Sequence, residues 1–326
     1  MTAAVLVVPV GARRGTGIAA ALGSALAFAS SGPLMKPLLE AGWSVGAALL
    51  VRMSLAGVLL APALIRAIRR DRRILRRQGL LIVGFGLTAV LGCQVFYFAA
   101  MQRMPVAVAL LIQYLAPVLL VLVAWARTRR APSRLVTVGS IAAIAGLVLV
   151  ADVAGARFDP LGTLFALGAA VCMAVYFLIS ERAGDDLPPL ALASGGLLVG
   201  AAGTAVLAAV GLLPLTAPPV SVALLGMSVP WWIPLLWVGA LATTLGYALG
   251  VKAVPMLGSR LASFVGLSEV LFALGFAWLL LGESPSPMQA VGGAILLAGV
   301  VMVRLDARSA GEPRGEAATV PVVPAP

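Results

Sequence analysis

Residues 44–65 read SVGAALLVRMSLAGVLLAPALI, an apolar run that holds a single charge, Arg52. The twelve residues that follow, RAIRRDRRILRR at 66–77, hold seven arginines and one acid. An α-helix rises 1.5 Å per residue, so about 20 apolar residues cross a hydrocarbon core of roughly 30 Å. This pair of segments therefore predicts a membrane-spanning helix that ends at an arginine-rich boundary.

The same pattern recurs along the chain. The sequence is 61% hydrophobic and 11% charged, with a mean hydropathy of +1.08, whereas a soluble domain carries about 25% charged residues. We therefore expect an all-α membrane protein with ten transmembrane helices. The predicted helices cover residues 16–35, 44–65, 79–101, 105–126, 135–151, 161–180, 189–212, 231–251, 259–281 and 286–304.

The distribution of basic residues predicts how these helices are oriented. Lys and Arg accumulate on the cytoplasmic side of membrane proteins. Ten spans with the N-terminus inside put 19 of the 23 basic residues on that side. We therefore expect both termini in the cytoplasm and a location in a bacterial-type inner membrane. Orientation in the lipid bilayer explains the net charge of +11, so binding to nucleic acid is not needed to explain it. The basic residues on the inner side are Arg13, Arg14, Arg66, Arg69, Arg70, Arg72, Arg73, Arg76, Arg77, Arg127, Arg129, Arg130, Arg134, Arg182, Lys252, Arg260, Arg304, Arg308 and Arg314.

An internal repeat divides the chain into two halves. A shift of 145 residues aligns the first predicted helix with the sixth, and a shift of 153 aligns the fourth with the ninth. Each half holds five spans, an odd number, so the second half is expected to be inverted relative to the first, with a solute site at their interface. The predicted parts are a flexible leader at 1–15, the repeats at 16–151 and 161–304, and a disordered cytoplasmic tail at 305–326. The matches are Gly17 with Gly162, Ala21 with Ala166, Leu22 with Leu167, Gly23 with Gly168, Ala29 with Ala174, Ala109 with Ala262, and Ala124-Trp125 with Ala277-Trp278.

Several short motifs resemble a known family. They are Gln102-Arg103-Met104-Pro105, Leu115-Ala116-Pro117-Val118, Ser268-Glu269-Val270, Trp278-Leu279-Leu280-Leu281-Gly282-Glu283, Cys172-Met173-Ala174-Val175-Tyr176 and Glu181-Arg182-Ala183-Gly184. Together with the two repeats they resemble the EamA-domain transporters of the drug/metabolite transporter superfamily, and most closely its threonine/homoserine exporter branch. Many members of that family have Glu where this chain has Ala116 and Pro where it has Val270. The resemblance implies a secondary exporter of amino acids or related small polar metabolites, working by alternating access, with no bound cofactor.

Two charges lie within predicted spans, Arg52 in the second and Glu269 in the ninth. Such charges cost about 2.5–3.5 kcal/mol each to insert, so they are candidates for function. Arg52 suits a substrate carboxylate, or else a structural carbonyl or Glu269 itself. Glu269 suits proton coupling or a substrate ammonium group, or else a helix-packing hydrogen bond. A direct ion pair between Arg52 and Glu269 would give the two residues one shared role, as a gate or lock between the two halves.

Polar side chains at similar depth form a second group of candidates for solute or ion binding. Those on helix faces turned into the bundle can contact a solute, but bonds between helices explain the glutamines equally well, and a packing role is favoured for the tyrosines. Pro117, and also Pro33 and Pro37, are expected to break or kink their helices. The second group comprises Gln94, Tyr97, Gln113, Tyr114, Tyr176 and Tyr247.

Other function classes find less support in the sequence. There is no His, no metal-ligand cluster, no phosphate-binding loop and no pair of intramembrane acids, so we expect neither an enzyme nor a metal site. A drug or cation exporter, or a metabolite importer, of the same fold remains an alternative, and a non-transporting membrane scaffold is a more remote one. The sequence leaves open whether the chain forms a homodimer.

Overall fold

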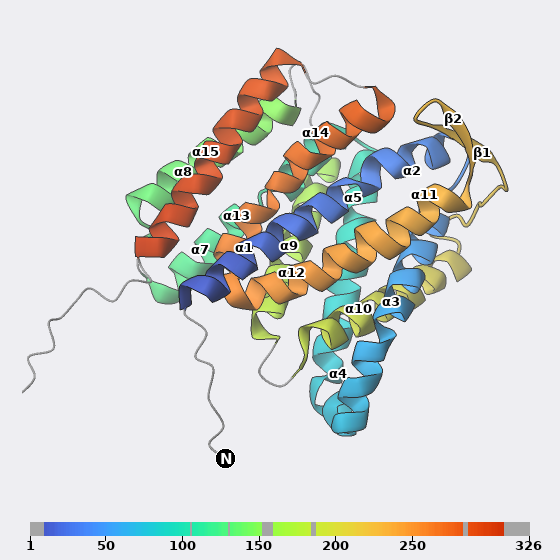
Figure 1. The fold of residues 1–326 in the computed structure, drawn as a ribbon, viewed down its shortest axis with the longest axis horizontal. Coiled ribbons are helices and arrows are strands. Elements are labelled where there is room, and N and C mark those ends of the chain that lie inside the picture. Colours follow the sequence, from blue (N-terminus) through green and yellow to red (C-terminus); the bar gives the residue numbers. More distant parts are fainter. Residues whose placement is uncertain are drawn as a thin grey trace, which may run out of the picture.

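The computed structural model describes residues 10–104, 106–129, 131–151, 159–183, 187–282 and 286–309, and most of these residues are helical (Figure 1). The first half contains α1 (Val10–Ala29), α2 (Ser31–Glu40), α3 (Val45–Arg70), α4 (Ile74–Gly84), the π-helix η1 (Phe85–Gly92), α5 (Cys93–Met101), α6 (Val106–Gln113), α7 (Ala116–Thr128) and α8 (Arg134–Ala151). The second half contains α9 (Pro160–Arg182), α10 (Pro189–Ala209), β1 (Ser221–Leu224), β2 (Met227–Pro230), α11 (Trp232–Leu236), the π-helix η2 (Trp237–Thr243), α12 (Thr244–Leu257), α13 (Ser259–Gly266), α14 (Ser268–Leu281) and α15 (Pro287–Ser309).

Within the described ranges, nine helical stretches are long and apolar enough to cross a membrane. They coincide with nine of the ten predicted spans, and the remaining one, 135–151, is the shorter apolar helix Arg134–Val150. Helix α1 begins six residues before the predicted first span, and α15 continues to Ser309, five residues into the segment expected to be a tail. The other residues of the expected leader and tail, 1–9 and 310–326, lie outside the described residues, as do Arg157 and the Glu283 of the Leu-Gly-Glu motif.

A break divides the first span at Ser30, between α1 and α2. Pro33 explains the position, because proline has no N–H to bond the carbonyl four residues earlier and its ring crowds that turn. The hydroxyls of Ser30 and Ser31 instead donate to the carbonyls of Ala27 and Phe28, each at 2.7 Å. Helix α2 then continues to Glu40, so the predicted boundary at residue 35 was too early.

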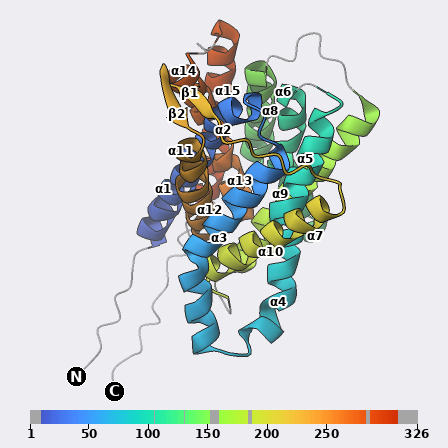
Figure 2. The same cartoon turned by 90° about the vertical axis from the view of Figure 1, so that its right-hand side faces the viewer.

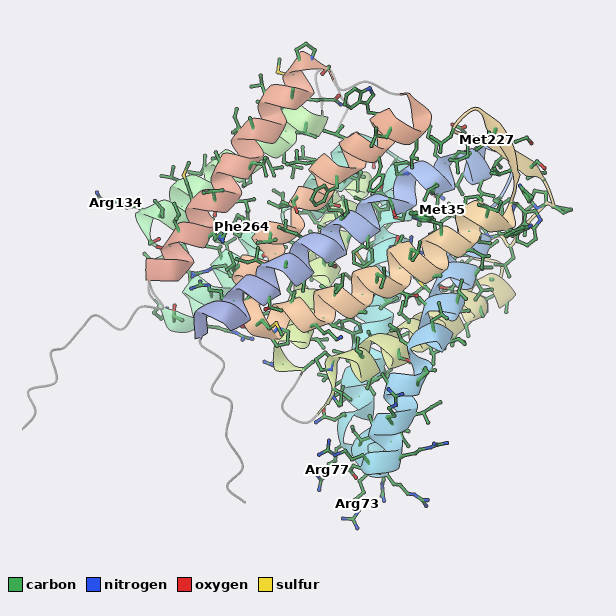
Figure 3. The ribbon with its side chains drawn as sticks, in the orientation of Figure 1. Met35, Arg73, Arg77, Arg134, Met227 and Phe264 are labelled. Atoms are coloured by element: carbon green, nitrogen blue, oxygen red, sulfur yellow. The ribbon has the colours of Figure 1, made fainter. Side chains whose placement is uncertain are left out.

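The arginine-rich segment after the second span is a helical hairpin rather than a loop. Helix α3 continues through Arg70, and α4 begins at Ile74, so only three residues separate the two helices. Arginine is a good helix former, and its charged end is solvated at this level. Figures 1 and 2 show the tip of this hairpin extending beyond the neighbouring helices, and Figure 3 shows Arg73 and Arg77 there, pointing outward.

The stretch 213–230, which lies between two predicted spans, contains an antiparallel β-hairpin in which Ser221 pairs with Pro230. Its leading residues are tied to the start of α3, where the Ser44 hydroxyl donates to the Pro214 carbonyl and also caps the helix by accepting from the N–H of Ala47. Trp43 is 5% exposed, and its indole N–H donates to the Pro218 carbonyl at 2.9 Å. This tryptophan therefore packs beneath the hairpin.

The main contacts between a helix of the first half and a helix of the second half have counterparts formed by the equivalent helices. Helix α1 packs on α12 and α5 packs on α9, while α1 also contacts α14 and α7 contacts α9. Two further pairs, α3 with α10 and α8 with α15, join equivalent helices of the two halves. The packing therefore follows the internal repeat that the sequence shifts predicted.

Helices α8 and α15 meet along a line of glycines. A Cβ placed on Gly146 would lie 2.6 Å from the carbonyl oxygen of Gly292, and one on Gly139 would lie 2.8 Å from that of Gly299. Real Cβ atoms are not found so close, so only glycine allows this approach. Gly139 and Gly292 are 153 residues apart, as are Gly146 and Gly299. The contact therefore relates equivalent positions, and the two helices run antiparallel.

Both halves also contain a π-helical segment in their third span. The N–H of Cys93 bonds the carbonyl of Thr88 at the end of η1, and the N–H of Thr244 bonds that of Gly239 at the end of η2, five residues back in each case. Such segments often occur at functional sites. The helices that continue from them, α5 and α12, carry side chains of the candidate site.

Candidate functional site

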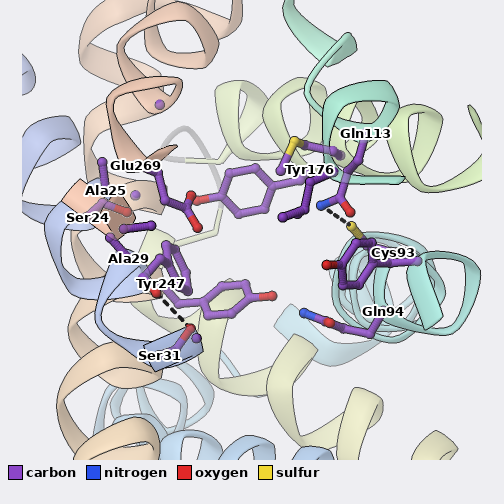
Figure 4. Close-up of a pocket in the computed structure, with 18 of the residues that line it drawn as sticks. Ser24, Ala25, Ala29, Ser31, Cys93, Gln94, Gln113, Tyr176, Tyr247 and Glu269 are labelled. Carbon is purple, nitrogen blue, oxygen red and sulfur yellow. Dashed lines mark hydrogen bonds between the residues drawn. The ribbon is translucent and has the colours of Figure 1, made fainter. Parts of the chain in front are cut away.

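A cavity of about 750 Å³ lies in the middle of the bundle and is lined by residues from both halves (Figure 4). Its volume lies within the usual range for small-molecule pockets, and most of its lining is apolar. All eight predicted site residues line it: Arg52, Gln94, Tyr97, Gln113, Tyr114, Tyr176, Tyr247 and Glu269.

Lining residues recur at the spacing of the repeat. Gln94 and Tyr247 are 153 residues apart, as are Tyr97 and Gly250, and all four line the cavity. At the shift of 145 residues that aligns the first span with the sixth, Phe28 corresponds to Met173 and Ser31 to Tyr176, and these also line it. The cavity therefore lies where the two halves meet.

Arg52 reaches the cavity from α3, about two turns after the helix begins at Val45. Its Nε atom is buried and has no hydrogen-bond partner. A buried donor without a partner costs free energy, commonly about 1–3 kcal/mol. Such a group in a cavity wall is suited to a ligand that supplies the acceptor.

Glu269 reaches the cavity from the other half, in the first turn of α14. The ninth span is broken at Leu267, and the Ser268 hydroxyl bonds the carbonyl of Val265 at 2.7 Å. A carboxylate is favoured in the first turn of a helix, where the backbone N–H groups point toward it. The Tyr114 hydroxyl interacts electrostatically with the Glu269 carboxyl group.

Arg52 and Glu269 attract each other electrostatically, but they do not form an ion pair. In the described part of the chain a salt bridge instead joins Arg260 to Asp306, at 3.9 Å and away from the cavity lining. The direct lock that the sequence suggested is therefore not formed, and both charges face the same cavity.

Glutamine and cysteine side chains form the wall opposite Glu269 (Figure 4). The Gln113 amide nitrogen donates to the Cys93 sulfur at 3.6 Å, and the Cys93 thiol donates to the carbonyl of Ala169 at 3.7 Å. The Gln113 carbonyl oxygen is buried and has no partner. Gln113 therefore joins two helices and keeps a free acceptor.

Aromatic rings form another part of the lining. Tyr247 stands edge-on to Phe28 with ring centres 5.2 Å apart and to Tyr176 with centres 6.0 Å apart. The Tyr176 hydroxyl lies directly over Gly250, where a Cβ would collide with it. The sequence favoured a packing role for these tyrosines, and the structure gives them ring contacts as well as access to the cavity.

Sequence reasoning missed other lining residues. Phe28, Ser31 and Cys93 line the cavity but were not among the predicted site residues. Alignment with Met173 and Tyr176 at the repeat shift could have indicated Phe28 and Ser31. Lys36 and Glu40 on α2 also line the cavity.

Pro117 breaks the fourth span as expected. Helix α6 ends at Gln113 and α7 begins at Ala116, so the break coincides with Gln113 and Tyr114, both at the cavity. Glu269 follows Ala116 by 153 residues, which puts it at the equivalent place in the second half. The two halves thus carry different side chains, alanine and glutamate, at one structural position.

Comparison with known proteins assigns the chain to a family. The model of the EamA-like transporter family matches residues 15–151 and again residues 160–305. The chain belongs to this family. It is a multi-pass transporter of a bacterial-type inner membrane, built from two EamA repeats.

Relatives with more specific names cover most of the chain. The threonine/homoserine exporter RhtA of Escherichia coli strain K12 is 29% identical over 69% of this chain and 72% of its own length. The probable terminal-alkyne amino-acid exporter of Streptantibioticus cattleyicolor is 29% identical over 85% of this chain and 89% of its own length. An uncharacterised transporter of Bacillus subtilis, YwfM, is 27% identical over 64% of this chain and 68% of its own length.

A solved crystal structure has the same fold. It superposes with a TM-score of 0.72 over 90% of this chain and 99% of its own, at 20% sequence identity. At this level of identity the match describes the fold alone.

Proposed function

We propose that this transporter exports amino acids or similar small zwitterionic metabolites by alternating access. The observation that carries the proposal is that Arg52 and Glu269, one from each half, face one cavity without pairing. A guanidinium group binds a carboxylate through two parallel hydrogen bonds, and a carboxylate attracts an ammonium group. The cavity therefore offers one site for each end of an amino acid. The names of the two exporter relatives agree with this substrate class.

The proposed topology has ten spans in two inverted halves with both termini in the cytoplasm. The antiparallel contact of α8 with α15 supports the inversion, and the position of the arginines supports the orientation. Helix α8 supplies the fifth span in chain order, and its short apolar length is compatible with a locally thinner bilayer or with its close packing on α15.

In the proposed cycle the structure represents the state open to the outside. Lys36 and Glu40, at the α2 end of the cavity, are exposed, whereas Ala253, Val254 and Ala262, at the other end, are at most 3% exposed. If each half adopted the conformation that the other half has here, the α2 end of the cavity would close and the α12–α13 end would open. Proton uptake and release by Glu269 would couple export to the proton gradient.

A cationic substrate is the second candidate, and the aromatic lining favours it. Phe28, Tyr176 and Tyr247 present rings next to a cavity that also holds Glu269. Aromatic faces attract ammonium groups, and this attraction grows when water is excluded. A substrate that needs Glu269 and not Arg52 would indicate this alternative.

The experiment that tests the proposal is efflux from reconstituted vesicles under an imposed proton gradient, with a panel of amino acids and of the matching amines. Glu269→Gln and Arg52→Ala are compared with the parent and with Arg127→Gln, an exposed arginine far from the cavity lining. We expect both cavity variants to lose amino-acid flux while the control retains it. If both correctly inserted variants keep the parent flux and its pH dependence, the site is wrong, and if no solute moves under any gradient, a scaffold role is favoured.

A further inference from the structure

The α3–α4 hairpin carries a charge cluster that the transport site does not use. Its seven arginines lie within twelve residues, and all seven are exposed. Figure 3 shows Arg73 and Arg77 at its tip, directed away from the bundle. We define the arginine hairpin as Arg66, Arg69, Arg70, Arg72, Arg73, Arg76 and Arg77.

The protein does not neutralise this cluster within its described residues. None of the seven guanidinium groups has an ion pair or a side-chain hydrogen bond there. The one acid in the hairpin, Asp71, uses an oxygen to accept from the backbone N–H of Arg73 at 2.8 Å. Like charges three or four residues apart on a helix destabilise it, so an external anion would relieve this repulsion.

The length of α3 places the cluster at the level of lipid headgroups. The apolar part from Val45 to Ile65 is about 31 Å long at 1.5 Å per residue, close to the roughly 30 Å of a hydrocarbon core. Arg66 comes immediately after it, and Arg70 lies about 6 Å further along the axis, within the thickness of a headgroup layer. On the returning helix α4, Leu80 is 87% exposed, which marks the level at which that helix re-enters the apolar layer.

We infer that the arginine hairpin binds the phosphate groups of anionic phospholipids and that transport depends on this binding. Arginine forms two parallel hydrogen bonds to a phosphate, and clusters of four to eight basic residues beside a transmembrane helix attract anionic lipid surfaces. The orientation of the chain requires only an excess of basic residues on one side, whereas this hairpin concentrates seven of them in one unpaired cluster.

The hairpin connects the second and third spans, and both spans contribute residues to the cavity lining. Lipid binding at the hairpin can influence transport through this connection. Helix α3 leads back to Arg52, and α4 continues through η1 to Gln94 and Tyr97 on α5. Phosphates bound at the tip would hold the ends of these two helices together at the membrane surface. Removal of the anionic lipid frees these ends. The two spans then no longer move together during the transport cycle, and flux falls.

The first test measures binding with purified full-length protein in detergent. Phosphatidylglycerol, phosphatidylcholine or soluble glycerophosphate is added, and bound lipid and the thermal unfolding midpoint are followed. The parent should bind and be stabilised by phosphatidylglycerol alone. The triple variant Arg72→Gln, Arg73→Gln, Arg76→Gln should bind it of the order of 100-fold more weakly, since each basic residue near an anionic surface contributes about fivefold. The corresponding lysine triple should keep much of the affinity.

A matched control removes the same charge elsewhere. Arg127 at the end of α7, Arg129 just after it and Arg134 at the start of α8 are also exposed, and their triple Gln variant should bind phosphatidylglycerol like the parent. Equal losses in both triples, or parent-like binding by the hairpin triple, would overturn the inference. Stabilisation by glycerophosphate at the same phosphate concentration would assign the site to a soluble phosphate and would also overturn it.

The second test measures flux in vesicles of phosphatidylcholine with and without phosphatidylglycerol. The parent should be several-fold faster with the anionic lipid, and the hairpin triple should respond little. Equal flux of the parent in both vesicles would overturn the link to transport. Because the binding test needs no substrate, its result stands separately from the identity of the transported solute.

Discussion

Under the proposed function, replacement of Arg52 by alanine should remove the contribution of the substrate carboxylate to binding. The guanidinium Nε is buried in the cavity wall without a partner, and a bound carboxylate would supply one. Hydrogen bonds to charged groups contribute about 1.5–3 kcal/mol each. Two such bonds in a cavity that water also reaches suggest a loss of about 3 kcal/mol, or of the order of 100-fold in affinity.

The measurement compares each amino acid with its methyl ester as a competitor of a labelled substrate in vesicles. Arg52→Ala should weaken the acid about 100-fold and the ester little, and Arg52→Lys should fall between, because lysine keeps the charge and loses the planar fork. An equal loss for acid and ester would refute the reasoning and assign Arg52 to packing.

The thermal stability of the substrate-free protein provides a control for the Arg52 substitutions. Since an unpaired buried donor costs free energy, Arg52→Leu should leave the thermal unfolding midpoint of the substrate-free protein unchanged or higher. A marked decrease would mean that Arg52 stabilises the fold through a contact other than its Nε, and the affinity losses would then have to be corrected for unfolding.

Three further predictions concern packing. Gly146→Val should destabilise the protein by several kcal/mol, seen as lost folded yield in detergent, because no Cβ fits against α15, whereas Gly79→Ala, with open space around it, should not. Gly250→Ala should strongly reduce flux, because its methyl group meets the Tyr176 hydroxyl, and adding Tyr176→Phe should restore part of that flux; no restoration would contradict the contact. Trp43→Phe should cost about 1 kcal/mol through the lost bond to the proline carbonyl before β1, and should speed proteolysis of segment 213–230; unchanged proteolysis would show that the bond does not hold the hairpin.

The spans were predictable because the bilayer imposes a strong constraint on every one of them. About 20 apolar residues must be consecutive, so the helices could be located from composition alone. Their ends were less predictable. Helix α2 continues past the apolar run to Glu40, and α3 continues through Arg70, because a helix outside the hydrocarbon layer is ended by backbone and turn chemistry rather than by polarity.

The candidate site was predictable where it carries charge and not where it is apolar. Arg52 and Glu269 stood out because an uncompensated charge in a span is costly. Phe28 looked like any other apolar residue of its helix, because hydropathy does not distinguish a side chain that faces lipid from one that faces a cavity. The hairpin at 213–230 was missed because its strands are only four residues long, and runs this short between prolines and a glycine carry little periodic signal.

The two π-helical segments carry information about the history of the chain. Gly86 in η1 and Gly239 in η2 are 153 residues apart, so both segments lie at the same place in their halves. A π-helical segment corresponds to a residue inserted into an α-helix, and each inserted residue turns the remainder of that helix by about 100°. Independent insertions at one position would be a coincidence. The simplest account is that a single ancestral five-helix unit already carried the insertion before it was duplicated, and that the rotation which brings Gln94 and Tyr247 to the cavity is older than the two-repeat protein.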